Sequence, residues 1–109
     1  MKVFLTFLII GILAVAGCIQ REIKTTPKEE LAREKCIELC LKANRDLSNG
    51  PCLSDDNIEW NIEDWVCDVA HSPRESVDNQ PENQCKAYRE GKAHHFVEVN
   101  PECKFIKAI

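Results

Sequence analysis

The stretch that decides the fold is residues 26–47, which read TPKEELAREKCIELCLKANRDL. It begins with the capping-box spacing, in which the Thr26 side chain can bond the amide of Glu29 and Pro27 takes the first helical position. Apolar side chains then recur at helical intervals and form one stripe, made of Ala32, Cys36, Leu39, Cys40, Ala43 and Leu47. Gly50 and Pro51 supply a stop. The pattern predicts a helix over about residues 27–47 with one buried face.

After this helix the apolar period changes to two, which is the period of a half-buried strand. One alternating run covers residues 57–63, and a second run over residues 65–71 has the opposite phase, so we expect a bulge near Asp64. Two later runs, 84–88 and 93–99, flank a loop in which Gly91 can take a positive φ. Residues 72–83 are polar, contain two prolines and predict a long loop. The fold class that follows is α+β, with the helix packed on a small antiparallel sheet.

Cysteine usage predicts a disulfide-rich domain. The chain of 109 residues holds seven cysteines, and in a short exported chain such a count is typical of a disulfide scaffold. Cys18 precedes the domain, which leaves six that can pair: Cys36, Cys40, Cys52, Cys67, Cys85 and Cys103. Cys36 and Cys40 point the same way from the helix, so we expect each to bond elsewhere and stitch the helix twice onto the sheet region. About fifteen pairings remain open. No CxxC occurs, so the usual dithiol and zinc-knuckle spacings are absent.

The N-terminal segment predicts export. Residues 3–19, VFLTFLIIGILAVAGCI, carry no charge and follow Lys2, which is the order of a secretory signal. The residues Val15-Ala16-Gly17-Cys18 resemble the lipobox of lipoproteins, and this resemblance implies cleavage before Cys18 and lipidation of its thiol. A retained transmembrane helix and a cleaved, freely secreted form are the alternatives. Residues 19–25 are expected to be a tether, and residues 26–109 a domain on the extracytoplasmic side of the cell membrane.

Charge argues against nucleic acid as a partner. All 18 acidic residues follow residue 18, whereas Lys2, one of the 14 basic residues, precedes it. The exported part is therefore net negative and has no block of Lys or Arg, so it would repel a phosphate backbone.

Two histidines are candidate metal ligands. His71 follows the alternation of Trp65, Cys67 and Val69, and His95 follows that of Ala93, Val97 and Val99, so the two could meet across an antiparallel sheet. Asp68, Asp78 or Glu98 could then complete an imidazole and carboxylate site for zinc or copper. Histidines half-buried at a sheet edge and bonded to backbone are the structural alternative.

No catalytic signature occurs in the sequence: there is no GxSxG elbow, no HExxH and no glycine-rich phosphate loop. The acidic residues 55–59 do not fit a calcium loop, since Trp60 and Val66 stand where Gly and Glu are required. We therefore expect that the protein is not an enzyme and uses no cofactor. We expect a membrane-anchored binding module for an unknown protein or small-molecule ligand. The alternative is an extracytoplasmic metal-binding protein that uses His71 and His95.

Overall fold

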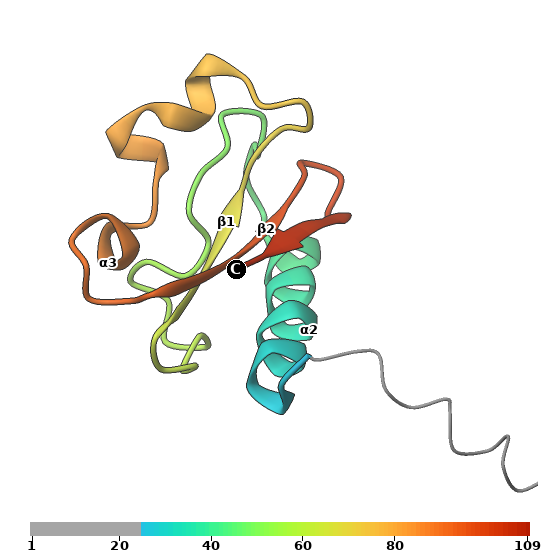
Figure 1. Cartoon of the computed structure of the whole chain (residues 1–109). Coiled ribbons are helices and arrows are strands. Elements are labelled where there is room, and N and C mark those ends of the chain that lie inside the picture. Colours follow the sequence, from blue (N-terminus) through green and yellow to red (C-terminus); the bar gives the residue numbers. More distant parts are fainter. Residues whose placement is uncertain (1–24) are drawn as a thin grey trace, which may run out of the picture.

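The computed structural model describes residues 25–109, so the expected signal peptide with Cys18, and tether residues 19–24, lie outside it. The described chain forms one long helix, α2, and three strands, β1, β2 and β3, with three short helical turns in the connection between β1 and β2 (Figure 1). Helix α2 contacts all three strands and covers one face of the sheet. The α+β class is as the sequence predicts.

Helix α2 spans Pro27–Lys42 and is shorter than the predicted helix over 27–47. It begins as expected, with the Thr26 hydroxyl accepting a hydrogen bond of 3.0 Å from the amide of Glu29. It ends early because Ala43 has an extended backbone and donates its amide to the carbonyl of Cys40. The buried stripe is confirmed for Ala32, Cys36, Leu39 and Cys40.

The sheet has the order β1-β2-β3, with β1 spanning Trp65–Val69, β2 His95–Val99 and β3 Phe105–Ala108. Strands β2 and β3 are antiparallel, but β1 and β2 are parallel, so the expected antiparallel sheet is wrong and the sheet is mixed. Residues 70–94 form the connection that a parallel pair requires, whereas residues 100–104 are long enough only for a hairpin. A bridge between Cys52 and Asp68 places residues 51–53 along the other edge of β1.

Two of the predicted strands are absent from the described chain. Residues 57–63 form turns, in which the Asn57 side chain accepts the amide of Glu59 at 2.9 Å and donates to the carbonyl of Leu53 at 3.2 Å. Asn side chains that bond the nearby backbone favour turns over strands. The alternation of residues 57–63 therefore predicted a strand where the chain forms turns. The expected run 84–88 contains instead the short helix α3, Lys86–Arg89. Positive φ values at Asp64 and Gly91 agree with the predicted bend and loop.

The connection from β1 to β2 crosses the far side of the sheet from α2. It contains the turns η1, Ser76–Asn79, and η2, Pro81–Asn83, before α3. Glu75 and Asp78 form a capping box at the start of η1. The predicted long loop is therefore a chain of short turns that covers part of a sheet face.

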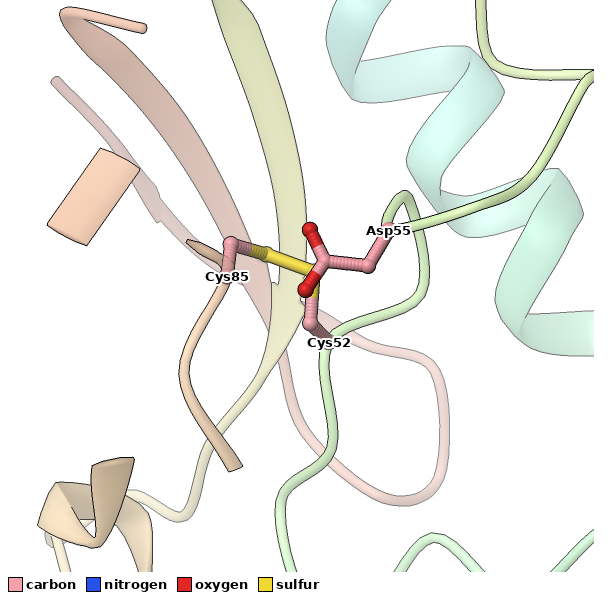
Figure 2. A group of neighbouring side chains, drawn as sticks. All are labelled: Cys52, Asp55 and Cys85. Atoms are coloured by element: carbon pink, nitrogen blue, oxygen red, sulfur yellow. A yellow bond between two sulfur atoms is a disulfide. The ribbon is translucent and has the colours of Figure 1, made fainter. Parts of the chain in front are cut away.

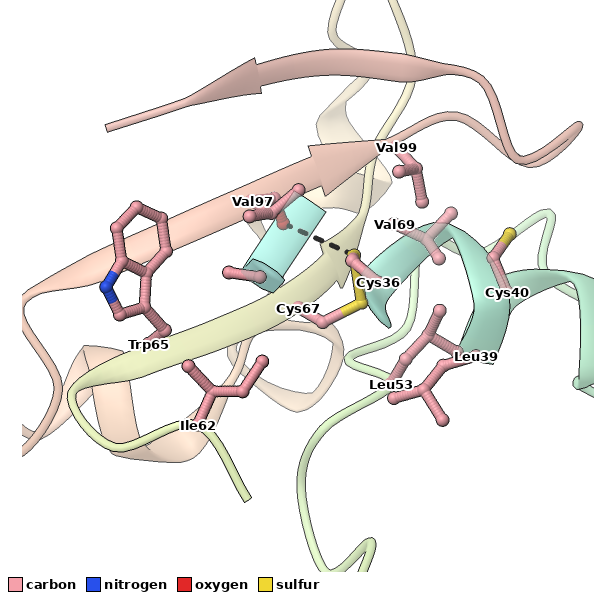
Figure 3. Close-up of a cluster of buried hydrophobic side chains, with 11 residues drawn as sticks. Cys36, Leu39, Cys40, Leu53, Ile62, Trp65, Cys67, Val69, Val97 and Val99 are labelled. Atoms are coloured by element: carbon pink, nitrogen blue, oxygen red, sulfur yellow. Dashed lines mark hydrogen bonds between the residues drawn. A yellow bond between two sulfur atoms is a disulfide. The ribbon is translucent and has the colours of Figure 1, made fainter. Parts of the chain in front are cut away.

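The core lies between α2 and the sheet and is closed by disulfides (Figure 3). Cys36 bonds Cys67 of β1 and Cys40 bonds Cys103 in the β2–β3 connection, so the helix is stitched twice, as expected. The third disulfide joins Cys52 to Cys85 on the opposite face of the sheet. All six domain cysteines predicted to pair do so, and one of these disulfides ties β1 directly to α2.

Candidate functional site

His71 and His95, expected to share a metal ion, lie at opposite ends of the pair formed by β1 and β2. The parallel register places Trp65 opposite His95 and Val69 opposite Val99, and His71 follows Val69 by two residues. Because a strand rises about 3.3 Å per residue, about 13 Å of strand separates the two ends. The structure does not bring the two histidines together, and the expected shared site is wrong. Antiparallel pairing would have joined these ends, whereas parallel pairing separates them.

His71 is held by the buried carboxylate of Asp78. The Nδ1 atom of His71 lies 3.0 Å from Oδ1 of Asp78, and the amides of His71 and Glu75 donate to Oδ2 at 3.0 and 2.9 Å. Burial works to raise the pKa of Asp78, but these hydrogen bonds outweigh it and hold the pKa below its ordinary value. These hydrogen bonds tie the crossover, through Asp78, to the end of β1. His71 therefore has a structural role as a partner of Asp78.

His95 stacks on Trp65, with ring centroids 4.7 Å apart, and approaches Asp64 together with His94. The Nδ1 atom of His94 lies 2.7 Å from Oδ1 of Asp64, and Nε2 of His95 lies 3.7 Å from Oδ2. The hydrogen bond from His94 lowers the pKa of Asp64. Neighbouring residues within a strand point to opposite faces, but β2 begins only at His95, so His94 lies outside the strand and can approach the same carboxylate. Ion pairs as exposed as these contribute little.

Within residues 25–109, one group of potential ligand side chains gathers closely, formed by Cys52, Asp55 and Cys85 with ligand atoms within 4.8 Å of one another (Figure 2). The two sulfurs are joined as a disulfide and are therefore not thiolates that could bind a metal. Both carboxylate oxygens of Asp55 accept the amide of Lys86, at 3.0 and 3.2 Å. The group holds the start of α3 against residues 52–55.

A pair of buried carboxyl groups lies on the sheet face that α2 does not cover. Asp68 of β1 and Glu98 of β2 are direct partners in the parallel register and are 9% and 5% exposed. Neighbouring strands are about 4.8 Å apart, so the two acids stand side by side. Two adjacent buried carboxyl groups are costly unless each is paired or protonated.

Glu98 has an ion-pair partner, whereas one oxygen of Asp68 has no hydrogen bond. Nη1 of Arg74 lies 2.9 Å from Oε2 of Glu98, and Arg74 is itself held by Asn79 at 2.8 Å. In contrast, Oδ1 of Asp68 is buried without any hydrogen bond from residues 25–109. Burial, and secondarily the charge of Glu98, raise the pKa of Asp68 to about 8, against the opposing charge of Arg74. Asp68 is therefore mostly protonated at neutral pH, beside Glu98, which is paired with Arg74.

These acids line an open cleft of about 270 Å³ between the sheet and the segment that carries α3. Its lining, which defines the cleft from here on, is Val66, Asp68, Arg74, Gln84, Cys85, Tyr88, Arg89, Phe96, Glu98 and Lys107. Tyr88 and Phe96 meet edge to face with ring centroids 5.1 Å apart. A concave site with apolar walls and a few convergent polar groups, one with a strongly shifted pKa, is typical of a ligand site.

From the sequence, Asp68 and Glu98 were expected only as additional ligands of a histidine metal site, not as a pair of neighbouring acids. Their signal was a single acid inside each of two apolar strands, WVCDV over 65–69 and HFVEV over 95–99. An acid in a strand that is buried on both faces is rare unless it is paired, and this could have drawn attention to both. Their juxtaposition could not be derived, because it requires the parallel register.

No protein-family model, no curated protein and no solved structure matches this chain. Among residues 25–109, no helix has the length and apolar character needed to span a membrane.

Proposed function

We propose that this protein is a membrane-anchored binding module, without catalytic turnover, that holds a small ligand in the cleft on the extracytoplasmic side. The observation that carries the proposal is the cleft, whose wall contains the buried carboxyl group of Asp68, with one oxygen that lacks a hydrogen bond, beside Glu98. A buried polar atom without a partner costs roughly 1–3 kcal/mol, so packing alone does not account for an acid in this wall.

The scaffold supports a binding role. Three disulfides hold α2, β1 and the α3 segment in fixed relation, so the cleft is formed before a ligand arrives. A preformed site loses less conformational entropy on binding. Disulfides persist in oxidising compartments outside the cytoplasm, in agreement with the export signal expected from residues 1–18.

Binding is tested with a fragment library of mixed charge. Chemical-shift changes in NMR spectra of the oxidised protein in detergent micelles report which fragments bind and where. We expect hits that shift the resonances of Val66 and Phe96, which line the cleft. Gln84→Trp, which fills the cleft from its wall, should abolish them, whereas Gln80→Trp on the exposed turn outside the lining should not. Hits that ignore Gln84→Trp, or no hits at all, would refute the proposed site.

The anchor is tested separately at Cys18. Intact-mass spectrometry of the exported protein should show lipid on an N-terminal Cys18 and a mass deficit for three disulfides. Cys18→Ser should leave an uncleaved precursor without lipid and with the same disulfide deficit. Cleavage of the Cys18→Ser chain at the same position would refute lipidation as the route of anchoring.

A further inference from the structure

Charged side chains of both signs line the cleft. Asp68 and Glu98, with Arg74, form the carboxyl end. Lys107 is the partner of Glu98 in the β2–β3 register, yet its ammonium lies 5.9 Å from the ring centroid of Phe96. Since Phe96 precedes Glu98 by two residues along β2, the carboxyl end and this cationic end lie about 7 Å apart along the strand.

The carboxyl end has a place for one positive charge. When Asp68 ionises, it and Glu98 carry two negative charges against the single charge of Arg74. Asp78, whose charge also acts on Asp68, already accepts hydrogen bonds from His71 and the Glu75 amide. A ligand with a nitrogen cation at this end of the cleft would balance the remaining negative charge.

The cationic end can bind the anionic group of a ligand whose remaining part is apolar. Lys107 and Arg89 both line the cleft, and no carboxylate of residues 25–109 forms a salt bridge with either. The edge-to-face pair of Tyr88 and Phe96 offers an aromatic surface between the two ends. A carboxylate near Lys107 and Arg89 would leave the apolar part of its ligand against these rings.

We infer that the cleft recognises a small zwitterion of the amino-acid class, with its nitrogen cation at Asp68 and Glu98 and its carboxylate at Lys107 and Arg89. This inference rests on the proposed binding function. A cleft of about 270 Å³ equals roughly nine water volumes at about 30 Å³ each, so it holds a single small molecule. The separation of the ends suits a ligand whose charges lie at opposite ends of a short body.

Binding of the nitrogen cation is coupled to loss of the Asp68 proton. The charged groups that face Asp68 are Glu98 from β2, Arg74 and Asp78 from the crossover, and at the cleft rim Lys107 and Arg89. With a pKa of about 8, the ionised fraction of Asp68 rises roughly 50-fold between pH 6 and pH 8, and the affinity for the cation rises with it.

The test compares three probes of similar shape by NMR titration of the oxidised full chain in detergent micelles. These are 4-(aminomethyl)benzoate, which is the zwitterion, and its two halves, benzylammonium and 4-methylbenzoate. We expect the zwitterion to bind at least about tenfold more tightly than either half. Its affinity should rise by tens of fold from pH 6 to pH 8.

Variants assign each end of the ligand. Asp68→Asn should remove the pH dependence, while Asp56→Asn, the same change on an exposed turn, should keep it. Lys107→Met should reduce the zwitterion to the affinity of benzylammonium, and Lys104→Met, exposed outside the lining, should have no effect. Because Lys107 is exposed, its variant tests the carboxylate end even where a change at Asp68 unfolds the chain.

Two results would overturn the inference while leaving the binding function intact. One is equal or tighter binding of 4-methylbenzoate in the cleft, and the other is zwitterion binding that does not change between pH 6 and pH 8. If none of the three probes shifts the resonances of the cleft, the zwitterion inference is also wrong, and the fragment library decides the wider proposal on its own.

Discussion

Replacing Asp68 by Asn should change how the stability of the fold depends on pH. Asn has nearly the shape of a protonated Asp but cannot ionise, so the variant removes the titration and keeps the packing. The folded pKa of Asp68 is raised to about 8, mainly by burial and then by Glu98, from an ordinary value of 3.8. A raised carboxyl pKa means that the folded state binds more protons than the unfolded state between these two values.

The sign and the size follow from this difference in bound protons. Stability from the protonated Asp68 is fully present below pH 3.8 and is lost as the pH rises to about 8. Each pH unit in that window lowers the free energy of unfolding by about 1.4 kcal/mol. Between pH 5 and pH 8 the loss sums to about 4 kcal/mol, which is a large fraction of the stability of a typical small domain.

The assay is urea unfolding of the oxidised chain in mild detergent at pH 5, 6, 7 and 8, followed by tryptophan fluorescence. The free energy of unfolding of Asp68→Asn, minus that of the parent, should rise by about 4 kcal/mol over this range. The exposed Asp56→Asn should keep a constant difference. Parallel profiles for Asp68→Asn and the parent would show that Asp68 does not hold its proton in the folded state, and would refute the electrostatic description of the cleft.

Three further predictions concern the scaffold. Gly50→Ala should lower the free energy of unfolding by roughly 2–4 kcal/mol, because its φ is +67° and an added Cβ would clash with Oδ1 of Asp78. Gly91→Ala, with a φ of +78° and no atom within 4 Å, should cost only about 1 kcal/mol, and equal losses in urea unfolding would contradict this account. Replacing Cys40 and Cys103 by Ala should cost about 4 kcal/mol in the same assay, since their disulfide closes a loop with a sequence separation of 63, and an unchanged midpoint would show that it contributes nothing. Because the pKa of Asp78 is lowered, its stabilisation is present above its unfolded value and is lost as the pH falls through the folded pKa. Asp78→Asn should therefore destabilise the fold at pH 6 and less so at pH 2, and an equal loss at both would contradict the charge-assisted role.

Local chemistry explains what the sequence predicted well. The Thr26 cap and the buried stripe of α2 depend only on residues within one helix, and the structure has both. Pairing of the six domain cysteines follows from their even number, and stitching of the helix at Cys36 and Cys40 follows from their shared face. These features need no knowledge of which strands are neighbours.

Long-range pairing explains what the sequence missed. A period of two shows that a segment alternates, but not which segment lies beside it or in which direction. The direction of β1 against β2 decided two predictions together: it separated His71 from His95, and it placed Asp68 beside Glu98. One error in strand direction thus produced both the wrong metal site and the overlooked carboxyl pair.

The position of the carboxyl pair bears on what the disulfides do. Strand β1 carries Asp68 next to Cys67, which bonds Cys36 on the side of α2, and it pairs with residue 52, which bonds Cys85 on the side of the cleft. A small core alone leaves little free energy with which to bury an acid that has an unpartnered oxygen, and disulfides supply several kcal/mol by restricting the unfolded chain. A hydrophobic residue at position 68 would remove the cost of burial altogether. That the chain buries an acid there instead, in the wall of an open cleft, is what a binding role accounts for and a purely structural role does not.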